Sequence, residues 1–425
     1  MARNPRTALK ATAATRATGQ AGQPLRILFL VFNRTGRGTY WRALGFGQEL
    51  ARRGHKVTLM SAAPGSGENV REKALDRVQL VQLADLHRGS GYDPWHALQR
   101  LRWLRDGDRG GAFDLVHVFE TRPVNLAPGL YLQRRYDTPL FMDWCDWFGR
   151  GGSVEERNNP VLRAALRPLE TFFEERFRRR AVGTTVINSI LQQKALDLGV
   201  DPATTLVLPN GANVQEIRPQ ARDDVRRRLG LPLEQRYLAY TGAIFERDAR
   251  LMARAFDHIC QARSDISLLM IGYCNISLKG LVKRPAAVIE SGPVSYRQLA
   301  DYVAAADVGW LPLRDRGANR GRFPMKAHDF MAAGRPLLVG DVGDLGAFVR
   351  QFDIGRAVAD EARAQAQAAL AMLNEPQTLE TLGRRARRVA VEERAWPVVA
   401  DGLEAFYYRQ LAHLHAQVEL EEKRA

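Results

Sequence analysis

Residues 322–336 combine residue types that suit the binding of an anion. Their pattern predicts a helix that begins near Pro324 and stops at Gly334, followed by a buried strand over residues 336–339. Proline near a helix start and glycine just past its end is the usual asymmetry. The free amides and the positive dipole end of such a helix attract anions. The segment therefore predicts an anion site at the start of this helix.

Two charged side chains fall inside this expected helix. Lys326 lies in the first turn, where its charge adds to the positive end of the helix, and Asp329 lies about one turn further. A carboxylate beside an anion site is placed to hold sugar hydroxyls, so the pair suits a nucleotide diphosphate with its ribose. An ordinary strand–helix–strand unit with a surface lysine explains the spacing equally well.

A glycine-containing loop is expected directly after the first strand. Gly36 and Gly38 lie within residues 33–40 and would let the backbone approach a phosphate or a sugar. The spacing is not the dinucleotide-binding fingerprint, because Trp41 occupies the position of its third glycine. We interpret the segment as a functional loop, and a plain turn is the alternative.

Two further expected strands carry polar and aromatic side chains near their ends. The strand over residues 115–119 contains a histidine and precedes an acid, and residues 143–152 hold two tryptophans and two aspartates. Aromatic rings cover the apolar faces of sugars, while carboxylates accept hydrogen bonds from their hydroxyls. A satisfied core histidine and a core tryptophan beside helix-capping acids are the alternatives. The side chains in question are His117, Glu120, Asp143, Trp144, Asp146 and Arg150.

The elements that position these residues alternate between short apolar runs and longer amphipathic stretches. This pattern predicts an α/β protein made of two tandem doubly wound, Rossmann-like domains with a cleft between them. We expect a disordered basic arm over residues 1–23, domains over 24–208 and 209–395, and a C-terminal helix assigned to 396–425, whose amphipathic pattern covers 396 to about 411. The expected strands cover residues 26–32, 56–60, 78–83, 115–119, 140–143, 185–187, 206–208, 237–241, 268–271, 287–290, 308–313, 336–339 and 355–358.

The composition is that of a globular protein with several cores, at 425 residues and 45% hydrophobic. Its three cysteines form no metal-like cluster, which favours a cytoplasmic location. We expect no metal site, including at Asp106 and Asp108, whose spacing matches metal-binding acids only superficially. No apolar run approaches the length of a membrane span.

The net charge of +15 and the isoelectric point of about 10.1 rest mostly on arginine. No nucleic-acid-binding motif accompanies the charge, so a specific nucleic-acid partner is not expected. Solvated helix faces explain most of the charge. A peripheral contact with an anionic membrane, at its inner face, is the functional alternative.

Residues 322–336 resemble the donor-binding motif of the family-four, or group 1, glycosyltransferases, enzymes with the two-domain GT-B fold. The resemblance extends from about Leu25 to Leu411 and includes a Pro-Asn-Gly hinge at residues 209–211 and an Asp-x-x-His pattern that ends at His117. It implies that the last helix crosses back onto the first domain. It also implies that the first domain holds the acceptor and the second the donor.

The resemblance assigns roles to individual residues. His117, or Glu120 beyond it, would line the reaction centre. The implied catalytic residues are His117, Lys326 and Asp329. The implied donor-binding residues are Gly242, Arg247, Gly272, Pro293, Met325, Lys326 and Asp329. The implied acceptor-side residues are Gly36, Gly38, Glu120, Asp143, Trp144, Asp146 and Arg150.

The chain departs from the family pattern at two positions. Ala243 replaces the usual arginine after the first strand of the second domain, which leaves Arg247 as the cation closest in sequence to that turn. The family often has two glutamates eight positions apart in this motif. Gly321 occupies the position of the first, and Asp329 occupies the position of the second as a shorter acid. A branch of the family with a Pro-x-Lys-x-x-Glu segment shares the missing first acid.

The implied activity is transfer of a sugar, with retention of configuration, from a UDP- or GDP-sugar to a glycan, lipid-linked or small-molecule acceptor. No strong catalytic base is evident, which suits a front-face mechanism in which the leaving phosphate accepts the proton. The nucleotide-sugar is a substrate, and no cofactor is expected. A nucleotide-sugar epimerase of the same fold and a non-catalytic sugar-nucleotide-binding relative are the alternatives.

Overall fold

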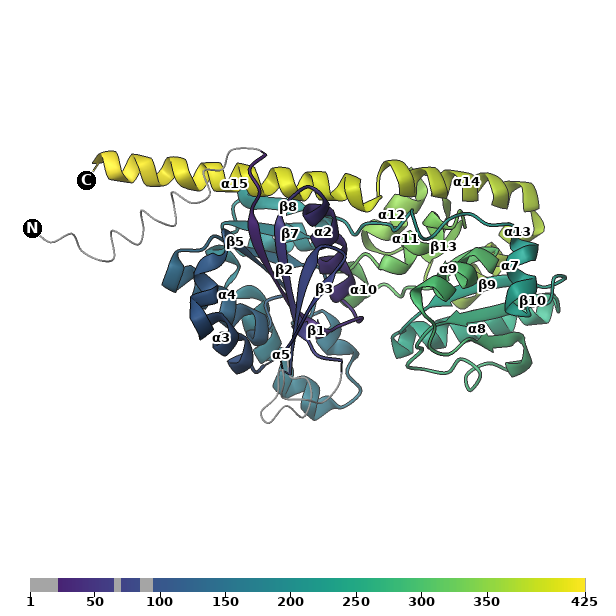
Figure 1. Cartoon of the computed structure of the whole chain (residues 1–425). Coiled ribbons are helices and arrows are strands. Elements are labelled where there is room, and N and C mark those ends of the chain that lie inside the picture. Colours follow the sequence, from purple (N-terminus) through teal and green to yellow (C-terminus); the bar gives the residue numbers. More distant parts are fainter. Residues whose placement is uncertain (1–21, 65–69, 85–94, 425) are drawn as a thin grey trace, which may run out of the picture. The chain divides into compact units, whose positions relative to one another are not determined.

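The structure is a computed structural model that describes residues 22–64, 70–84 and 95–424. Most of the predicted basic arm, residues 1–21, lies outside the described residues. The chain forms two compact units (Figure 1). One contains the described residues up to Pro209 together with those from Val399, and the other contains Asn210–Val398. Each unit is described by itself below.

The first unit is built on an eight-stranded sheet with the order β3-β4-β2-β1-β5-β6-β7-β8. Every neighbouring pair is parallel except β3 with β4, which is antiparallel. The order reverses direction between β1 and β5, as in doubly wound sheets. The strands are β1 (Arg26–Arg34), β2 (Lys56–Ala62), β3 (Arg71–Leu75), β4 (Val78–Leu83), β5 (Leu115–Phe119), β6 (Leu140–Trp144), β7 (Gly183–Val186) and β8 (Thr205–Val207).

Helices cover both faces of this sheet, which explains why its central strands are continuous apolar runs. Leu28, Val116 and Met142 point to one face and pack with Trp103 and Leu126 of the helices there. The helices that belong wholly to this unit are α2 (Tyr40–Arg52), α3 (Leu98–Arg105), α4 (Pro123–Tyr136), α5 (Pro160–Glu175) and α6 (Ser189–Asp197).

The terminal helix α15 (Trp396–Arg424) packs against the other face from Val399 onward. The ring centroid of its Tyr407 lies 4.8 Å from that of Phe141 on β6. Gly183 of β7 permits this approach, because an added Cβ would lie 2.7 Å from a ring carbon of Phe406. The helix is longer than the apolar pattern to residue 411 indicated.

The second unit contains a six-stranded, fully parallel sheet with the order β11-β10-β9-β12-β13-β14. Its order reverses between β9 and β12. The strands are β9 (Arg236–Thr241), β10 (Ile266–Ile271), β11 (Val288–Glu290), β12 (Val308–Leu311), β13 (Leu337–Gly340) and β14 (Gly355–Val358). The helices are α7 (Arg222–Leu229), α8 (Glu246–Ala262), α9 (Tyr296–Ala305), α10 (Gly317–Arg320), α11 (Met325–Ala332), α12 (Gly343–Gln351), α13 (Ala362–Asn374) and α14 (Pro376–Glu392).

These two sheets confirm the predicted tandem doubly wound architecture. The pattern missed one strand, β3, whose sequence Arg-Glu-Lys-Ala-Leu is mostly charged and exposed. An antiparallel edge strand has only one neighbour and faces solvent, so it carries no apolar run for the pattern to detect.

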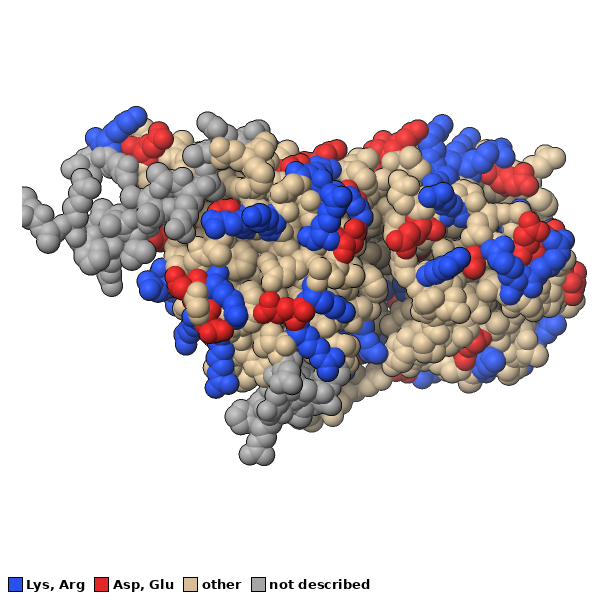
Figure 2. All heavy atoms as spheres, in the orientation of Figure 1, with Lys and Arg blue, Asp and Glu red and all other residues tan. Residues whose placement is uncertain are grey.

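The high positive charge is distributed rather than gathered on the face in view, where Figure 2 shows basic side chains interleaved with acidic ones. Many of these pairs are exposed ion pairs on helices, such as Arg250 with Glu246 on α8. Among the described helices, none combines the length and apolar character needed to cross a membrane.

Candidate functional site

The predicted helix at residues 324–334 is present as α11, with Pro324 as its N-cap and Gly334 in the left-handed region at φ 68° after its end. α11 connects β12 to β13, so its amino end lies at the carboxyl edge of the second sheet. It begins at Met325, directly after Pro324, whose φ of −61° suits a helix but whose ψ of 128° is still extended. Lys326 is its second residue.

Lys326 reaches the loop that follows β9. Its Nζ donates to the carbonyl oxygen of Ala243 at 3.0 Å and lies 3.7 Å from the ring centroid of Tyr240. The Tyr240 hydroxyl donates to the same carbonyl at 2.8 Å. These contacts place Lys326 at the turn that contains Ala243, where the sequence departs from the family pattern. Nζ has three protons, and neither the carbonyl nor the ring prevents it from also donating to a ligand.

Two glycines open the loops beside this lysine. Gly242 and Gly272, directly after β9 and β10, have φ of 71° and 83°, which L side chains rarely adopt. A Cβ added to Gly242 would meet nothing within 4 Å, so the space beside its backbone is open. A Cβ on Gly272 would lie 4.0 Å from the amide nitrogen of Gly242, which shows that the two loops are adjacent.

The environment of α11 changes the ionisation of both charged candidates. Burial, and then the charge of Arg322, lower the pKa of Lys326 well below its usual value. Burial raises the pKa of Asp329 to about 7, and the charge of Lys326 opposes this increase. Shifts of this kind are typical of functional sites. Both side chains are half-buried, so a ligand can reach them.

Arg322 is a cation near Lys326 that the sequence argument did not assign to the site. Its guanidinium lies 4.6 Å from the ring centroid of Phe245, and its Nη2 is 2.5 Å from Oδ1 of Asn319 and 3.5 Å from the buried carboxylate of Asp248. The sequence feature that could have identified Arg322 as a site residue is its position as the first residue of the motif 322–336. Arg247 is exposed at the second position of α8, and its predicted phosphate contact stays a prediction.

The remaining donor-side candidates lie on the same unit. Met325 is the half-buried first residue of α11, and Pro293 is exposed in the turn after β11. Their predicted contacts with a nucleotide stay predictions. Tyr296 lies at the start of α9. Burial and the nearby charge of Asp329 raise the pKa of its hydroxyl. Tyr240 and Tyr296 are thus polar neighbours of the motif that no spacing rule indicated.

On the first unit, Glu120 lies directly after β5 with φ at 69°, a strained conformation for a non-glycine residue. Its Oε1 accepts hydrogen bonds from the amides of Cys145 at 2.7 Å and Asp146 at 3.0 Å, and from the Cys145 thiol at 3.0 Å. Burial and the charge of Asp146 raise its pKa to about 8.

The carboxylates of Glu120 and Asp146 and the Cys145 sulfur lie within 4.8 Å of one another. Because Glu120 already accepts from two backbone amides, the geometry favours the fixing of a loop over the binding of a metal. Asp146 is half-buried and Arg150 is exposed, so both stay candidates for contact with an acceptor.

Asp143 and Trp144, two of the predicted acceptor-side residues, have partners within the first unit, and their acceptor role stays a prediction. Asp143 is fully buried, and its two oxygens accept from Nε and Nη2 of Arg42 on α2 at 2.9 and 2.8 Å. Trp144 is also fully buried, with its indole donating to Glu174 at 2.9 Å and the Arg178 guanidinium 3.7 Å from its ring centroid. Both side chains are occupied within the unit, because they are strand residues of β6 with helices on either face.

The structure places His117 in the core of the first unit, and its predicted role at the reaction centre stays a prediction. His117 lies in the middle of β5 and is fully buried. Its Nδ1 is 2.6 Å from the Tyr407 hydroxyl of α15, and its Nε2 is 3.3 Å from the hydroxyl of Thr185. Burial lowers its pKa to about 4, so it is neutral at physiological pH. It is a satisfied core histidine, the alternative weighed for a lone histidine on an apolar strand.

The glycine loop after β1 is held in a defined shape. Gly36 and Gly38 have φ of 81° and 55°, and a Cβ on Gly38 would lie 2.8 Å from Asn33 Nδ2. Asn33 in turn accepts from the amide of Thr39 at 3.0 Å. The Trp41 indole donates to the Gly36 carbonyl at 3.0 Å. The tight turn requires both glycines, and their contact with a ligand stays a prediction.

Comparison with protein families matches both units. Residues 37–211 match the model described as a glycosyl transferase 4-like domain, and residues 235–375 match the model described as glycosyl transferases group 1. The two matches fall on separate units and together cover most of the chain. The second includes Lys326, Asp329 and the loops after β9 and β10.

Curated relatives include the D-inositol 3-phosphate glycosyltransferase of Rhodococcus opacus, 30% identical over 223 residues, which are 48% of this chain and 48% of the relative. The enzyme of the same name from Thermobispora bispora is 29% identical over 234 residues, 51% of this chain and 53% of the relative. The chain spans about half the length of the curated relatives that it matches.

Solved structures with the same fold include sucrose-phosphate synthase from Thermosynechococcus elongatus, with a TM-score of 0.73, 19% identity, and coverage of 91% of this chain and 100% of that one. HepE of Anabaena, solved with UDP-glucose, has a TM-score of 0.61 and 13% identity over 92% of this chain and 100% of that one. WaaG, a glycosyltransferase of lipopolysaccharide biosynthesis, has a TM-score of 0.66 and 14% identity over 88% and 98% of the two chains.

Proposed function

We propose that this protein, which belongs to the group 1 glycosyltransferases with the GT-B fold, transfers a hexose from a UDP-sugar to a hydroxyl of a carbohydrate acceptor, with retention of configuration. The observation that carries the proposal is Lys326, which projects from the amino end of α11 to the open glycine turn after β9. A nucleotide-sugar donor follows from the family. HepE has been solved with UDP-glucose, which supports UDP over GDP.

The proposed role of this arrangement is to stabilise the leaving diphosphate. Negative charge grows on that group as the glycosidic bond breaks, and preorganised donors aimed at it lower the barrier. Lys326, the first amides of α11 and Arg322 would supply those donors. We expect Arg322 to take the place of the arginine that the family usually has at Ala243, because its charge already acts on Lys326.

The Asp329 carboxylate would hold the donor by accepting hydrogen bonds from the sugar hydroxyls of the donor. An ionised carboxylate is a stronger acceptor than a protonated one. Its pKa of about 7 means that the protein gains this acceptor as the pH rises through neutrality. Lys326 acts in the opposite direction, because its lowered pKa means that it loses its charge at a lower pH than an ordinary lysine.

The test is calorimetric titration of the full chain with UDP-glucose and GDP-mannose across a range of pH. The diphosphate of a nucleotide sugar is a diester and does not titrate near neutrality, so a change in affinity reports on the protein. We expect UDP-glucose to bind and its affinity to rise by about tenfold between about pH 6 and about pH 8. Deprotonation of Lys326 should lower the affinity, and it should occur at a lower pH than for an ordinary lysine.

Asp329→Asn is the control for this titration, and it should remove the rising limb of the pH profile. A flat profile for the unmodified chain would contradict the role of Asp329. Binding of GDP-mannose alone would overturn the choice of UDP. Binding of neither sugar nucleotide would favour a non-catalytic relative, with Ala243 and Gly321 as the reason.

We also propose that α5 contacts an anionic membrane surface. This helix exposes its apolar side: Val161, Leu162, Leu169 and Phe172 are 77, 46, 41 and 49% exposed. They recur at helical spacing and form one stripe. Arg176, the exposed C-cap residue of α5, lies on the same side as the stripe, which matches a surface that is both apolar and negatively charged.

The opposite side of α5 is buried but polar. Glu170 pairs with Arg157 at 2.8 Å and with Arg122 at 3.2 Å. Glu174 accepts from the amides of Phe148 and Gly149, both at 2.7 Å. Buried ion pairs and hydrogen bonds therefore hold the helix in place, and its apolar side chains are left for a partner.

Vesicle co-sedimentation tests this contact. The double variant Val161→Ser and Phe172→Ser should bind vesicles with anionic lipid at least about tenfold more weakly than the unmodified chain, since each buried side chain contributes about 1.5–3 kcal/mol. Val391→Ser on α14, also 40% exposed, is the matched control and should bind normally. Equal binding of the double variant, or equal binding to vesicles without anionic lipid, would contradict the proposal.

A further inference from the structure

The second unit contains a cavity of about 280 Å³ at the edge of its sheet opposite to the donor candidates. Asp307 immediately precedes β12, and Arg335 and Pro336 immediately precede β13, so the cavity lies at the amino ends of these strands. The donor candidates Lys326 and Gly242 lie at the carboxyl ends. The cavity is lined by Pro219, Arg222, Asp307, Gly334, Arg335, Pro336, Leu379, Glu380, Gly383, Arg384 and Arg387.

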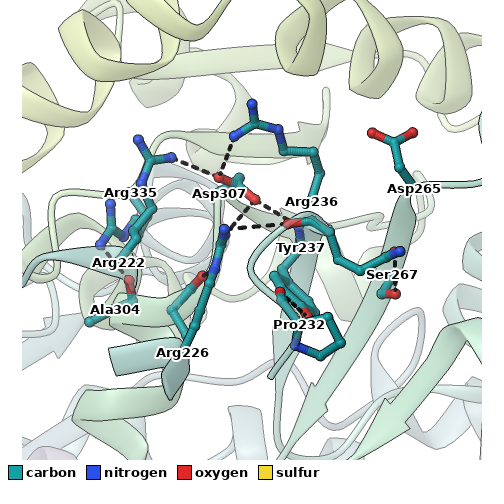
Figure 3. A network of polar contacts seen from close by, with 12 residues as sticks. Arg222, Arg226, Pro232, Arg236, Tyr237, Asp265, Ser267, Ala304, Asp307 and Arg335 are labelled. Atoms are coloured by element: carbon teal, nitrogen blue, oxygen red, sulfur yellow. Dashed lines mark hydrogen bonds and ion pairs between the residues drawn. The ribbon is translucent and has the colours of Figure 1, made fainter. Parts of the chain in front are cut away.

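A buried carboxylate anchors the arginines on one side of the cavity. Asp307 accepts from Arg222 and Arg226, each at 2.7 Å, and from the amide of Tyr237 at 2.7 Å, while Arg236 lies 3.8 Å away (Figure 3). Three guanidinium groups thus converge on a single carboxylate. Its charge cannot neutralise all of them, so this side of the cavity keeps an excess of positive charge.

Two other lining arginines are bonded to neutral carbonyl groups. Arg335 is 8% exposed and donates to the carbonyls of Gln220 at 3.2 Å and of Ala304 at the end of α9. Arg387 donates to three carbonyls, those of Val214, Ile217 and Ala332, at 2.7 to 3.0 Å. These carbonyls leave the guanidinium charge uncompensated, and the buried Nε of Arg335 has no hydrogen-bond partner among the described residues.

The ionisation of both arginines agrees with a positive field in this region. Burial, with the charges of Arg222 and Arg226, lowers the pKa of Arg335 to about 10. Burial and the charge of Arg218 lower the pKa of Arg387. An anion in the cavity would remove part of this mutual repulsion.

On the outer side of the cavity, two arginines make only long contacts with Glu380. Nη2 of Arg222 and Nη1 of Arg384 each lie 3.9 Å from a carboxylate oxygen of Glu380, which is beyond hydrogen-bond distance. The Glu380 side chain is 58% exposed and can move aside. The lining contains four arginines and two carboxylates, which leaves two positive charges in excess.

We propose that this cavity is a second ligand site, separate from the donor segment, that binds a small phosphate-bearing molecule between Arg222 and Arg384. Planar guanidinium groups match the oxygens of a phosphate group, which accepts several charge-assisted hydrogen bonds at once. Arg335 and Arg387 contribute charge from fixed positions. A purely structural role explains the carbonyl-bound Arg387, but it does not explain the excess positive charge of the lining or the buried Nε of Arg335 that no described residue pairs.

Titration of the full chain with inorganic phosphate, followed by calorimetry and by the shift in melting temperature, tests the site. Charge reversal by Arg384→Glu should weaken binding of inorganic phosphate by about tenfold or more. Arg388→Glu is the matched control, because Arg388 lies one turn further on α14, is 65% exposed against 71% for Arg384, and does not line the cavity. It should bind phosphate within about twofold of the unmodified chain.

Lys326→Ala separates this site from the donor segment and should leave phosphate binding unchanged. Binding that is lost in Lys326→Ala but kept in Arg384→Glu would place the phosphate at the donor segment and overturn the proposal. Equal loss in Arg384→Glu and Arg388→Glu would show only a general effect of charge, and would overturn it as well. The absence of phosphate binding to the unmodified chain would have the same consequence.

Discussion

Lys326→Ala should reduce the affinity of the protein for UDP, and its rate of sugar transfer, by about 100- to 1000-fold. Lys326 is half-buried, and the Ala243 carbonyl and the face of Tyr240 hold its ammonium group in position. Because this ammonium group is already desolvated and oriented, it loses little further solvation or freedom when a diphosphate binds. Its removal therefore costs most of the attraction between the protein and that diphosphate. Calorimetry with UDP and a transfer assay with UDP-glucose measure the two effects.

Two further variants make this result specific. Lys279→Ala removes an exposed lysine from the same unit, in the segment that follows β10, and should leave UDP binding unchanged. Lys326→Arg keeps the charge, so it should retain part of the affinity but lose rate, because the bulkier guanidinium changes the position of the charge. Normal UDP binding by a folded Lys326→Ala protein would show that α11 is not the donor site.

Removal of the Arg42 guanidinium should destabilise the first unit by about 3–5 kcal/mol, because it leaves the Asp143 carboxylate buried without a partner. Arg42 and Asp143 are both fully buried and form two hydrogen bonds at 2.8 and 2.9 Å. Arg42 also donates to the carbonyl of Leu208 at 2.9 Å, and the Thr185 hydroxyl donates to Asp143 at 2.5 Å. Urea unfolding of Arg42→Met, followed by tryptophan fluorescence, measures the loss.

The pH dependence of stability provides a second readout. Burial alone would raise the pKa of Asp143, but the charge and hydrogen bonds of Arg42 outweigh it and lower the pKa. The ion pair therefore stabilises the unit above the unfolded pKa of about 4, and this contribution disappears as the pH falls through the lower folded value. Asp143→Asn should lose that dependence.

An exposed ion pair is the control for this experiment. Arg227 and Asp224 on α7 are 2.7 Å apart, with side chains 60 and 64% exposed. Arg227→Ala should change stability by less than about 1 kcal/mol. If Arg42→Met were equally mild, the Arg42–Asp143 pair would not be a main anchor of the first unit.

The sequence alone determined the elements and their order, because the relevant signals are local. Continuous apolar runs identified the buried parallel strands on both sheets, and proline and glycine bounded α11 to within a residue. β3 escaped detection because an exposed edge strand has no such run, and α15 continued beyond its apolar residues. Both differences occur where neighbouring elements, or their absence, decide the structure.

The tertiary structure decided which candidate side chains face solvent and which are core residues. His117 and Trp144 have the residue types of a sugar site, but His117 packs against α15, 290 residues further along the chain, and Trp144 bonds to Glu174 of α5, 30 residues further. Arg322 is held beside Lys326 by Phe245 and Asp248, which come from a distant part of the sequence. Burial and the charges contributed by other elements set the pKa values of Lys326, Asp329 and Glu120, because desolvation depends on packing in three dimensions, which residue spacing does not specify.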